Sequence, residues 1–135
     1  MKTMVCVDCK PLITVLRERF GPIPDDAITT SRYYPAAKSP SGSAVWWFDL
    51  PLEALQKGEG EHRYLICRGQ FCGCCSFDVL RVPVKYFLDH LDALKTIKKD
   101  DETFVRLLLS AVKVGRFTDL FGPGRVEFAE WKIKV

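Results

Sequence analysis

The chain has 135 residues, of which 47% are apolar and 27% are charged, and its formal net charge is +3. This size and composition are typical of one globular domain that folds without a metal or a disulfide, and they exclude wholesale disorder. The small positive charge argues against a strong non-specific nucleic-acid binder, because such domains carry large basic patches.

The first ten residues contain no apolar core of a signal peptide, and no apolar run is long enough to cross a bilayer. We therefore expect a cytoplasmic protein without membrane contact. Six cysteines in such a reducing compartment are more often metal ligands or reactive thiols than disulfides.

The first predicted element is a helix that begins near Pro11 and ends at Gly21. Leu12, Leu16 and Phe20 recur with the period of a helix, proline suits a first helical turn, and glycine suits the position after the last one.

The segment 21–43 is predicted to be a long loop. It holds four prolines and a Ser-Gly-Ser sequence, and it has no sustained apolar period. Such a connection is either a mobile surface segment or a binding loop. A binding loop here would present Arg32, Tyr33 and Tyr34.

Residues 44–50, AVWWFDL, predict a strand with two apolar faces, because Trp46 and Trp47 lie on opposite sides of it. A strand of this kind is central in a sheet or is covered by a helix or a partner subunit. A short helix over 51–58 follows, with proline at its start and glycine at its end.

The second half of the chain is predicted to contain a hairpin, a helix and further strands. Residues 62–68 and 77–82 form the hairpin, with 69–76 at its tip. Residues 82–95 form the clearest amphipathic helix. The segment 102–112 fits a helix or a buried strand.

The last eleven residues, 125–135, alternate between apolar and polar side chains, with a phase slip near Ala129 that a β-bulge would produce. Residues 1–135 are therefore predicted to form a single α+β domain. Its architecture would be a mostly antiparallel sheet of four to five strands with two or three packed helices.

Four cysteines form two Cys-x-x-Cys pairs, Cys6 with Cys9 and Cys72 with Cys75. Two such pairs can supply four thiolates to one tetrahedral Zn²⁺, although the two pairs are farther apart in the sequence than in common zinc folds. A thiol-redox site and a set of free thiols are the alternatives. No cofactor is required for folding, and zinc is the one that the sequence suggests.

A second candidate site consists of aromatic and basic residues, namely Arg32, Tyr33, Tyr34, Trp46 and Trp47. Rings beside cations stack the bases of single-stranded nucleic acid, and Trp, Tyr and Arg anchor protein interfaces. The simpler alternative is that most of these rings belong to the hydrophobic core.

The segments WWFDLPLEAL, YLICRG, FDVLRVPVKYFLDHLDAL and GRVEFAEW follow one another in an order that resembles a family of uncharacterised small bacterial proteins. Members of this family are carried as open reading frames in integrons and other mobile gene cassettes. The resemblance covers the C-terminal two thirds, from Val45 onward. It implies a strand for TFVRLLLS and implies no activity.

Motifs of the common enzyme classes are missing from the sequence: a glycine-rich phosphate loop, His-Glu-x-x-His and Gly-x-Ser-x-Gly. A non-enzymatic function is therefore favoured, namely a small cytosolic binding or accessory module that self-associates as a homodimer. Its ligand would be a small molecule or a protein. The alternatives are a zinc-stabilised or thiol-redox protein and a weak binder of single-stranded nucleic acid, which is the less expected partner.

Overall fold

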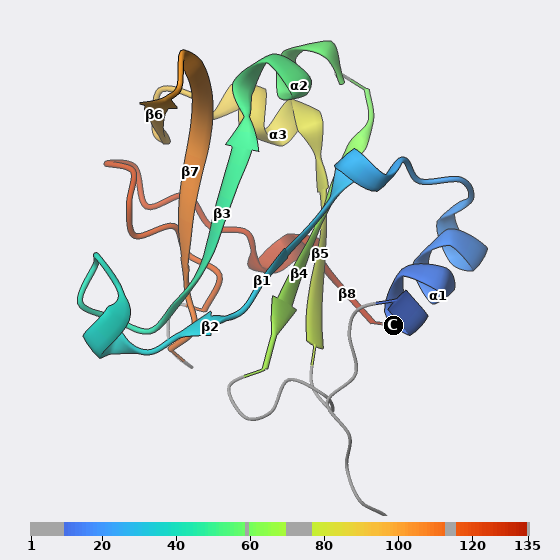
Figure 1. Ribbon diagram of the computed structural model, residues 1–135, viewed down its shortest axis with the longest axis horizontal. Helices are drawn as coiled ribbons and strands as arrows, with labels where there is room; N and C mark the ends of the chain where they lie inside the picture. The colour runs from blue at the N-terminus through green and yellow to red at the C-terminus, as the bar shows by residue number, and fades with distance from the viewer. Residues whose placement is uncertain (1–9, 59, 70–76, 113–115, 135) are drawn as a thin grey trace, which may run out of the picture.

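A computed structural model describes residues 10–58, 60–69, 77–112 and 116–134 (Figure 1). The described strands form two sheets of four, sheet A with the order β1-β4-β5-β8 and sheet B with the order β2-β3-β7-β6. The strands are β1 (Ile28–Ser31), β2 (Tyr33–Tyr34), β3 (Val45–Pro51), β4 (His62–Arg68), β5 (Phe77–Pro83), β6 (Lys95–Lys99), β7 (Glu102–Ser110) and β8 (Lys132–Ile133). The helices are α1 (Lys10–Phe20), α2 (Leu52–Lys57) and α3 (Val84–Asp89), with short 3₁₀ turns η1 (Asp25–Ala27), η2 (Ala36–Lys38) and η3 (Ala129–Trp131).

These elements confirm the α+β class and the mostly antiparallel pairing. Among the described strands, β1 and β4 are the one parallel pair. The strands are divided between two sheets where the sequence predicted one. The division arises at Arg32, where the chain leaves β1 in sheet A and enters β2 in sheet B.

The prediction of a loop over 21–43 is wrong, because this segment contributes a strand to each sheet. β1 pairs with β4 from Ile28 opposite Tyr64 to Ser31 opposite Cys67. The Ser31 hydroxyl also accepts a hydrogen bond of 2.8 Å from the backbone N–H of Trp47 in sheet B. Strands of four and two residues are too short to show a period among prolines and polar residues.

The main core lies between the two sheets. Along β4, Leu65 and Cys67 face this core, whereas Tyr64 and Ile66 face α1, as the alternation of side chains along a strand requires. Each large apolar side chain that is fully buried here contributes about 1.5–3 kcal/mol to folding. The central strands supply Trp46, Phe48, Leu50, Val105, Leu107 and Leu109 from sheet B and Leu65, Cys67, Leu80 and Val82 from sheet A.

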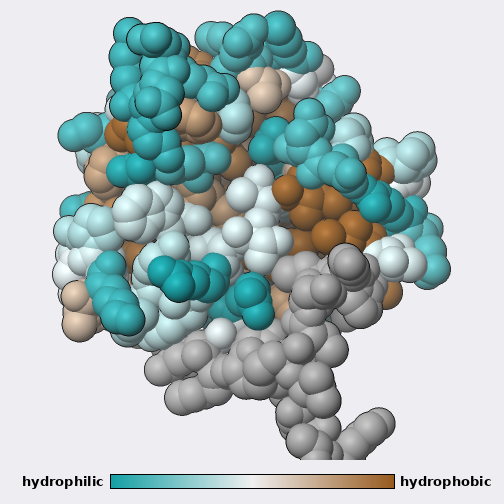
Figure 2. Space-filling model, viewed as in Figure 1, coloured by the Kyte–Doolittle hydropathy of each residue, from teal (hydrophilic) through white to brown (hydrophobic). Residues whose placement is uncertain are grey.

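The helix predicted before Gly21 is confirmed, and it covers the outer face of sheet A. Leu16 is fully buried against Tyr64 and Ile66. Gly21 ends the helix with a φ of 84° and donates its N–H to the Arg17 carbonyl at 2.9 Å. Figure 2 shows apolar side chains gathered between this helix and the sheet.

The helix predicted over 82–95 is too long, because α3 ends at Asp89 and β6 begins at Lys95. Two turns follow α3, in which Ala93 and Leu94 donate to the carbonyl of His90 at 2.9 and 3.1 Å. These turns keep Leu94 in the core. Its spacing from the apolar residues of α3 therefore looks, in the sequence, like the period of one continuous helix.

The open choice between a helix and a strand for the segment 102–112 is settled by pairing. Residues 102–110 form strand β7, which pairs with both β3 and β6. The strand predicted over 125–135 is wrong for most of its length, because within the described residues of this segment the strand β8 covers two residues, Lys132–Ile133. The phase slip near Ala129 is the 3₁₀ turn η3 rather than a β-bulge. This turn brings Phe128 into the main core and starts β8 at the edge of sheet A.

A fully buried carboxylate, Asp119, organises the chain after β7. Its Oδ1 accepts hydrogen bonds from the backbone N–H groups of Leu108 at 3.0 Å and Phe121 at 3.1 Å. Its Oδ2 accepts from Gly122 at 3.0 Å. Two of these amides, those of Leu108 and Gly122, donate buried hydrogen bonds and the third a partly buried one, so Asp119 fixes the return of the chain along β7. No helix within the described ranges is long and apolar enough to cross a membrane.

Candidate functional site

The structure separates the five residues of the predicted aromatic site. Trp46 and Tyr33 belong to the inner side of sheet B, where Trp46 is 2% exposed and its indole N–H donates to the Arg68 carbonyl at 2.7 Å. The Trp46 ring stacks on Phe117 with 5.5 Å between centroids. These two rings therefore have a structural role in the core.

The other three residues, Arg32, Tyr34 and Trp47, come together on the outer face of sheet B. The Arg32 guanidinium lies 4.8 Å from the centroid of the Tyr34 ring, and the Tyr34 and Trp47 centroids are 5.5 Å apart. Arg106 from β7 lies 4.7 Å from the Trp47 ring. We call these four residues the cation–aromatic surface. A nucleic-acid base that stacked on Tyr34 or Trp47 would have to share the ring with the guanidinium that already lies over it.

Asp49 holds Arg106 in place beside this surface. The guanidinium donates two hydrogen bonds to the carboxylate, at 2.8 and 3.0 Å, and Lys99 adds a third at 3.3 Å. Burial by itself would raise the pKa of Asp49. The hydrogen bonds and charge of Arg106, with smaller contributions from Lys99 and Trp47, outweigh it and hold this pKa below its ordinary value.

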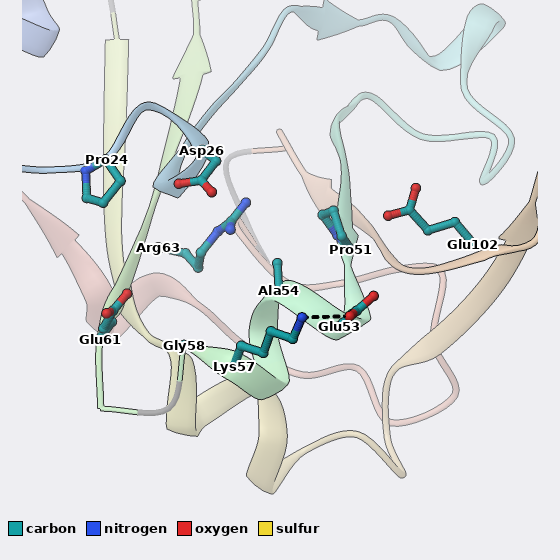
Figure 3. Close-up of a pocket in the computed structure, with 10 residues that line it drawn as sticks. All are labelled: Pro24, Asp26, Pro51, Glu53, Ala54, Lys57, Gly58, Glu61, Arg63 and Glu102. Atoms are coloured by element: carbon teal, nitrogen blue, oxygen red, sulfur yellow. Dashed lines mark ion pairs between the residues drawn. The ribbon is translucent and has the colours of Figure 1, made fainter.

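A pocket of about 590 Å³ opens at the end of the two sheets where η1, α2 and the first residues of β4 meet (Figure 3). Pockets that hold small ligands usually have about 300–1,000 Å³. Pro51, at the start of α2, and Gly58, at its end, form part of the wall. The charged lining residues are Asp26, Glu53, Lys57, Glu61, Arg63 and Glu102.

Arg63 is the buried charge of this pocket, which we call the Arg63 pocket. It lies opposite Val82 in the β4–β5 pair and in phase with Leu65, so its side chain projects between the sheets. Arg63 is 7% exposed. A cation at this depth is unusual unless a carboxylate accompanies it.

The Arg63 guanidinium has few partners. Its Nη2 lies 3.4 Å from the hydroxyl of Thr29, and within the described part of the chain its Nε has no hydrogen-bond partner and no carboxylate forms an ion pair with it. Burial lowers the pKa of Arg63, and the negative charge of Asp26 offsets only part of that effect. A buried donor without an acceptor costs about 1–3 kcal/mol. Arg63 can therefore accept a ligand group at little further cost.

The remaining charges of the pocket lie at its mouth. Lys57 and Glu53 form an ion pair of 2.7 Å along α2, drawn as a dashed line in Figure 3. The hydrogen bond and the charge of Lys57 lower the pKa of Glu53. Asp26, Glu61 and Glu102 are exposed, and none of them has an ion pair with another described residue.

The predicted metal ligands Cys6, Cys9, Cys72 and Cys75 lie outside the described residues, so the zinc or thiol-redox site stays a prediction. Cys67, which is described, is a free thiol and is fully buried. Burial raises the pKa of this thiol well above its ordinary value, and the charge of Asp78 adds to the effect. Cys67 is therefore a packing residue.

Sequence reasoning missed Arg63 and Asp26. A signal for Arg63 was present, because in HRYLICR it stands two residues before Leu65 and four before Cys67, so that all three share one face of the predicted strand. Asp26 carried no such signal, since its position depends on the packing of η1 against β4.

No family model, no curated protein and no solved structure matches the chain. The resemblance to proteins of mobile gene cassettes therefore stays a prediction from the sequence.

Proposed function

We propose that this protein is a binding module and that its ligand occupies the Arg63 pocket, placing an anionic group on the Arg63 guanidinium. The observation that carries this proposal is a 7% exposed arginine on the wall of a pocket of about 590 Å³, with a buried Nε that has no partner among the described residues.

The energetic argument for a ligand is the cost of leaving this charge in place. Replacing a buried charge by an apolar side chain of similar size is often neutral or stabilising. Residues that break the rules of folding in this way are expected at functional sites. The planar guanidinium is also suited to bind a carboxylate or phosphate with two parallel hydrogen bonds.

The proposal includes a cytoplasmic location and a homodimer. The free, buried thiol of Cys67 is compatible with a reducing compartment. An edge-to-edge dimer through β6 is disfavoured, because lysines at an exposed sheet edge oppose pairing with another strand. The cation–aromatic surface, with Tyr34 and Trp47 half-buried, is the surface of sheet B that we assign to self-association. A strict monomer in light scattering at micromolar concentration would contradict this part.

The binding proposal is tested by isothermal titration calorimetry with a panel of small carboxylates, amino carboxylates among them, and phosphate monoesters. At least one member should bind the wild-type protein and the Arg125→Met control, in which an exposed arginine away from the pocket lining is replaced. Arg63→Met should abolish this binding. Arg63→Lys keeps the charge but loses the planar donor pair, so affinity should fall by about tenfold or more.

The proposal is wrong if no member of the panel binds the wild-type protein. It is also wrong if Arg63→Met binds the same ligand as tightly as the wild type, because the ligand would then sit elsewhere.

A further inference from the structure

The charge around the Arg63 pocket is not that of a simple anion site. Of its six charged lining residues, Lys57 and Glu53 neutralise each other in an ion pair. One buried cation, Arg63, and three exposed carboxylates remain among the described lining residues. A ligand with only negative charge would be attracted by the guanidinium and repelled by all three carboxylates.

The positions of these charges are ordered by depth. The guanidinium is buried between the sheets, whereas the carboxylates of Asp26, Glu61 and Glu102 are on exposed residues. Figure 3 shows the Arg63 side chain in the middle of the lining residues, with Asp26 next to it and with Glu61 and Glu102 on opposite sides of the view. A ligand would therefore meet an inner positive group and an outer negative ring.

Asp26 links the two charge zones. Its charge acts on the Arg63 guanidinium, yet the two side chains do not form an ion pair. An acid group that binds Arg63 would come close to the Asp26 carboxylate and be repelled by it. A positive group on the same ligand, a few bonds away, would remove that repulsion and satisfy the outer carboxylates.

We propose that the ligand of the Arg63 pocket is a small amino carboxylate, with its carboxylate on Arg63 and its ammonium group among Asp26, Glu61 and Glu102. This inference rests on the proposed function, since it assigns the chemical class of the ligand for the same site. The three carboxylates select a ligand that carries an ammonium group. Arg63 holds the carboxylate end and so fixes the orientation of the bound ligand.

The test compares three probes of matched length by calorimetry: 4-aminobutanoate, butanoate and butylamine. The comparison is repeated with glycine and 6-aminohexanoate and their matched monofunctional partners, so that the spacing between the charges is varied. At the best length, the zwitterion should bind at least about tenfold more tightly than the carboxylate or the amine. Arg63→Met should abolish zwitterion binding.

The carboxylates are tested by charge-neutral variants that keep the shape, Asp26→Asn, Glu61→Gln and Glu102→Gln. At least one of them, and Asp26→Asn above all, should weaken zwitterion binding several-fold and strengthen binding of the plain carboxylate. The negative charge that each variant removes attracts the ammonium group of the zwitterion and repels the plain carboxylate. This change of opposite sign is not expected from a variant that merely perturbs the fold. Glu18→Gln, an exposed substitution on α1, should change neither affinity.

The outcomes separate the two proposals. If the plain carboxylate binds as tightly as the zwitterion and Arg63→Met abolishes both, the anion site stands and the zwitterion inference is wrong. If the amine binds as tightly as the zwitterion and Arg63→Met has no effect, the pocket is a cation site and both are wrong. If no probe of any length binds, the amino carboxylate inference is wrong, and the phosphate monoesters and larger carboxylates of the first panel decide the proposed function.

Discussion

Replacing Arg63 by methionine should stabilise the ligand-free protein. Methionine has a similar length, so it keeps the apolar stem in the space beside the pocket wall while it removes the guanidinium. The wild-type side chain gives up its hydration at 7% exposure and donates one hydrogen bond of 3.4 Å, to the Thr29 hydroxyl, in the described structure. The folded state therefore carries a desolvated cation that the unfolded state hydrates.

The size of this effect follows from the groups left unpaired. A buried donor without a partner costs about 1–3 kcal/mol, and even buried charges that are paired are often replaced by apolar groups with a gain of about 1–4 kcal/mol. The Coulomb attraction to Asp26 is lost and offsets part of the gain. We expect Arg63→Met to raise the free energy of unfolding by about 1–3 kcal/mol, which for a domain of this size raises Tm by about 3–5 °C per kcal/mol.

The stabilisation should not depend on pH in the neutral range. Burial lowers the pKa of Arg63 in the folded state. For a base whose folded pKa is lowered, the cost is fully present below the folded pKa and disappears only above the unfolded pKa, which for arginine lies far above neutral pH. The difference between Arg63→Met and the wild type should therefore be constant between about pH 6 and pH 9.

Urea denaturation followed by tryptophan fluorescence measures this difference. Arg63→Ala should not stabilise to the same extent, because it leaves unfilled volume beside the pocket wall. Arg125→Met should change the free energy of unfolding by less than about 0.5 kcal/mol, as exposed substitutions usually do. A loss of more than about 1 kcal/mol in Arg63→Met, at an unchanged m-value, would refute the reasoning, because Arg63 would then be a structural residue.

Three further predictions concern the rest of the fold. Asp119→Ala should lower the free energy of unfolding by about 3–5 kcal/mol in urea denaturation, since three amides lose a buried acceptor; a loss below about 1 kcal/mol would show that they find other acceptors. Asp49→Asn should lower the free energy of unfolding by about 1 kcal/mol at neutral pH. This loss should disappear as the pH falls below about 3.9 and through the lowered folded pKa, because Asp49 stabilises the fold only while it is ionised. A loss of the same size in acid would contradict the role of the Arg106 ion pair. Cys67 should resist iodoacetamide in the native protein and react after denaturation, as peptide mass spectrometry can show, because its thiol is fully buried and its pKa is raised; modification of native Cys67 at the rate of a free thiol would contradict its burial.

Local patterns in the sequence were sufficient for most of the elements. The α1 stripe of Leu12, Leu16 and Phe20 has the period of 3.6 that burial of one helix face imposes on a chain. Strands β3 and β4 are short apolar runs bounded by polar residues, which is the pattern of strands covered on both faces. The α+β class follows from their sum. The candidate zinc ligands Cys6, Cys9, Cys72 and Cys75 remain a prediction of the sequence, because they lie outside the described residues.

Where the prediction was wrong, pairing or packing overrode a local pattern. The segment 21–43 reads as a loop by composition, but β4 and β3 supply partners for its short strands. The helix predicted over 82–95 is interrupted because two turns keep Leu94 in the core and β7 supplies a partner for β6. Hydrogen-bond partners that are distant in the sequence leave no trace in a window of a few residues.

The sequence by itself determined that the strand β3 has two apolar faces and that Trp46 and Trp47 lie on opposite sides of it. Only the tertiary structure decided that Trp46 is core while Trp47 joins Arg32 and Tyr34 at the surface. It also decided that Arg63 is the buried charge of a pocket. The physical reason is that alternation specifies a direction within one strand, whereas burial and charge pairing depend on what the second sheet, η1 and α2 place opposite that side chain.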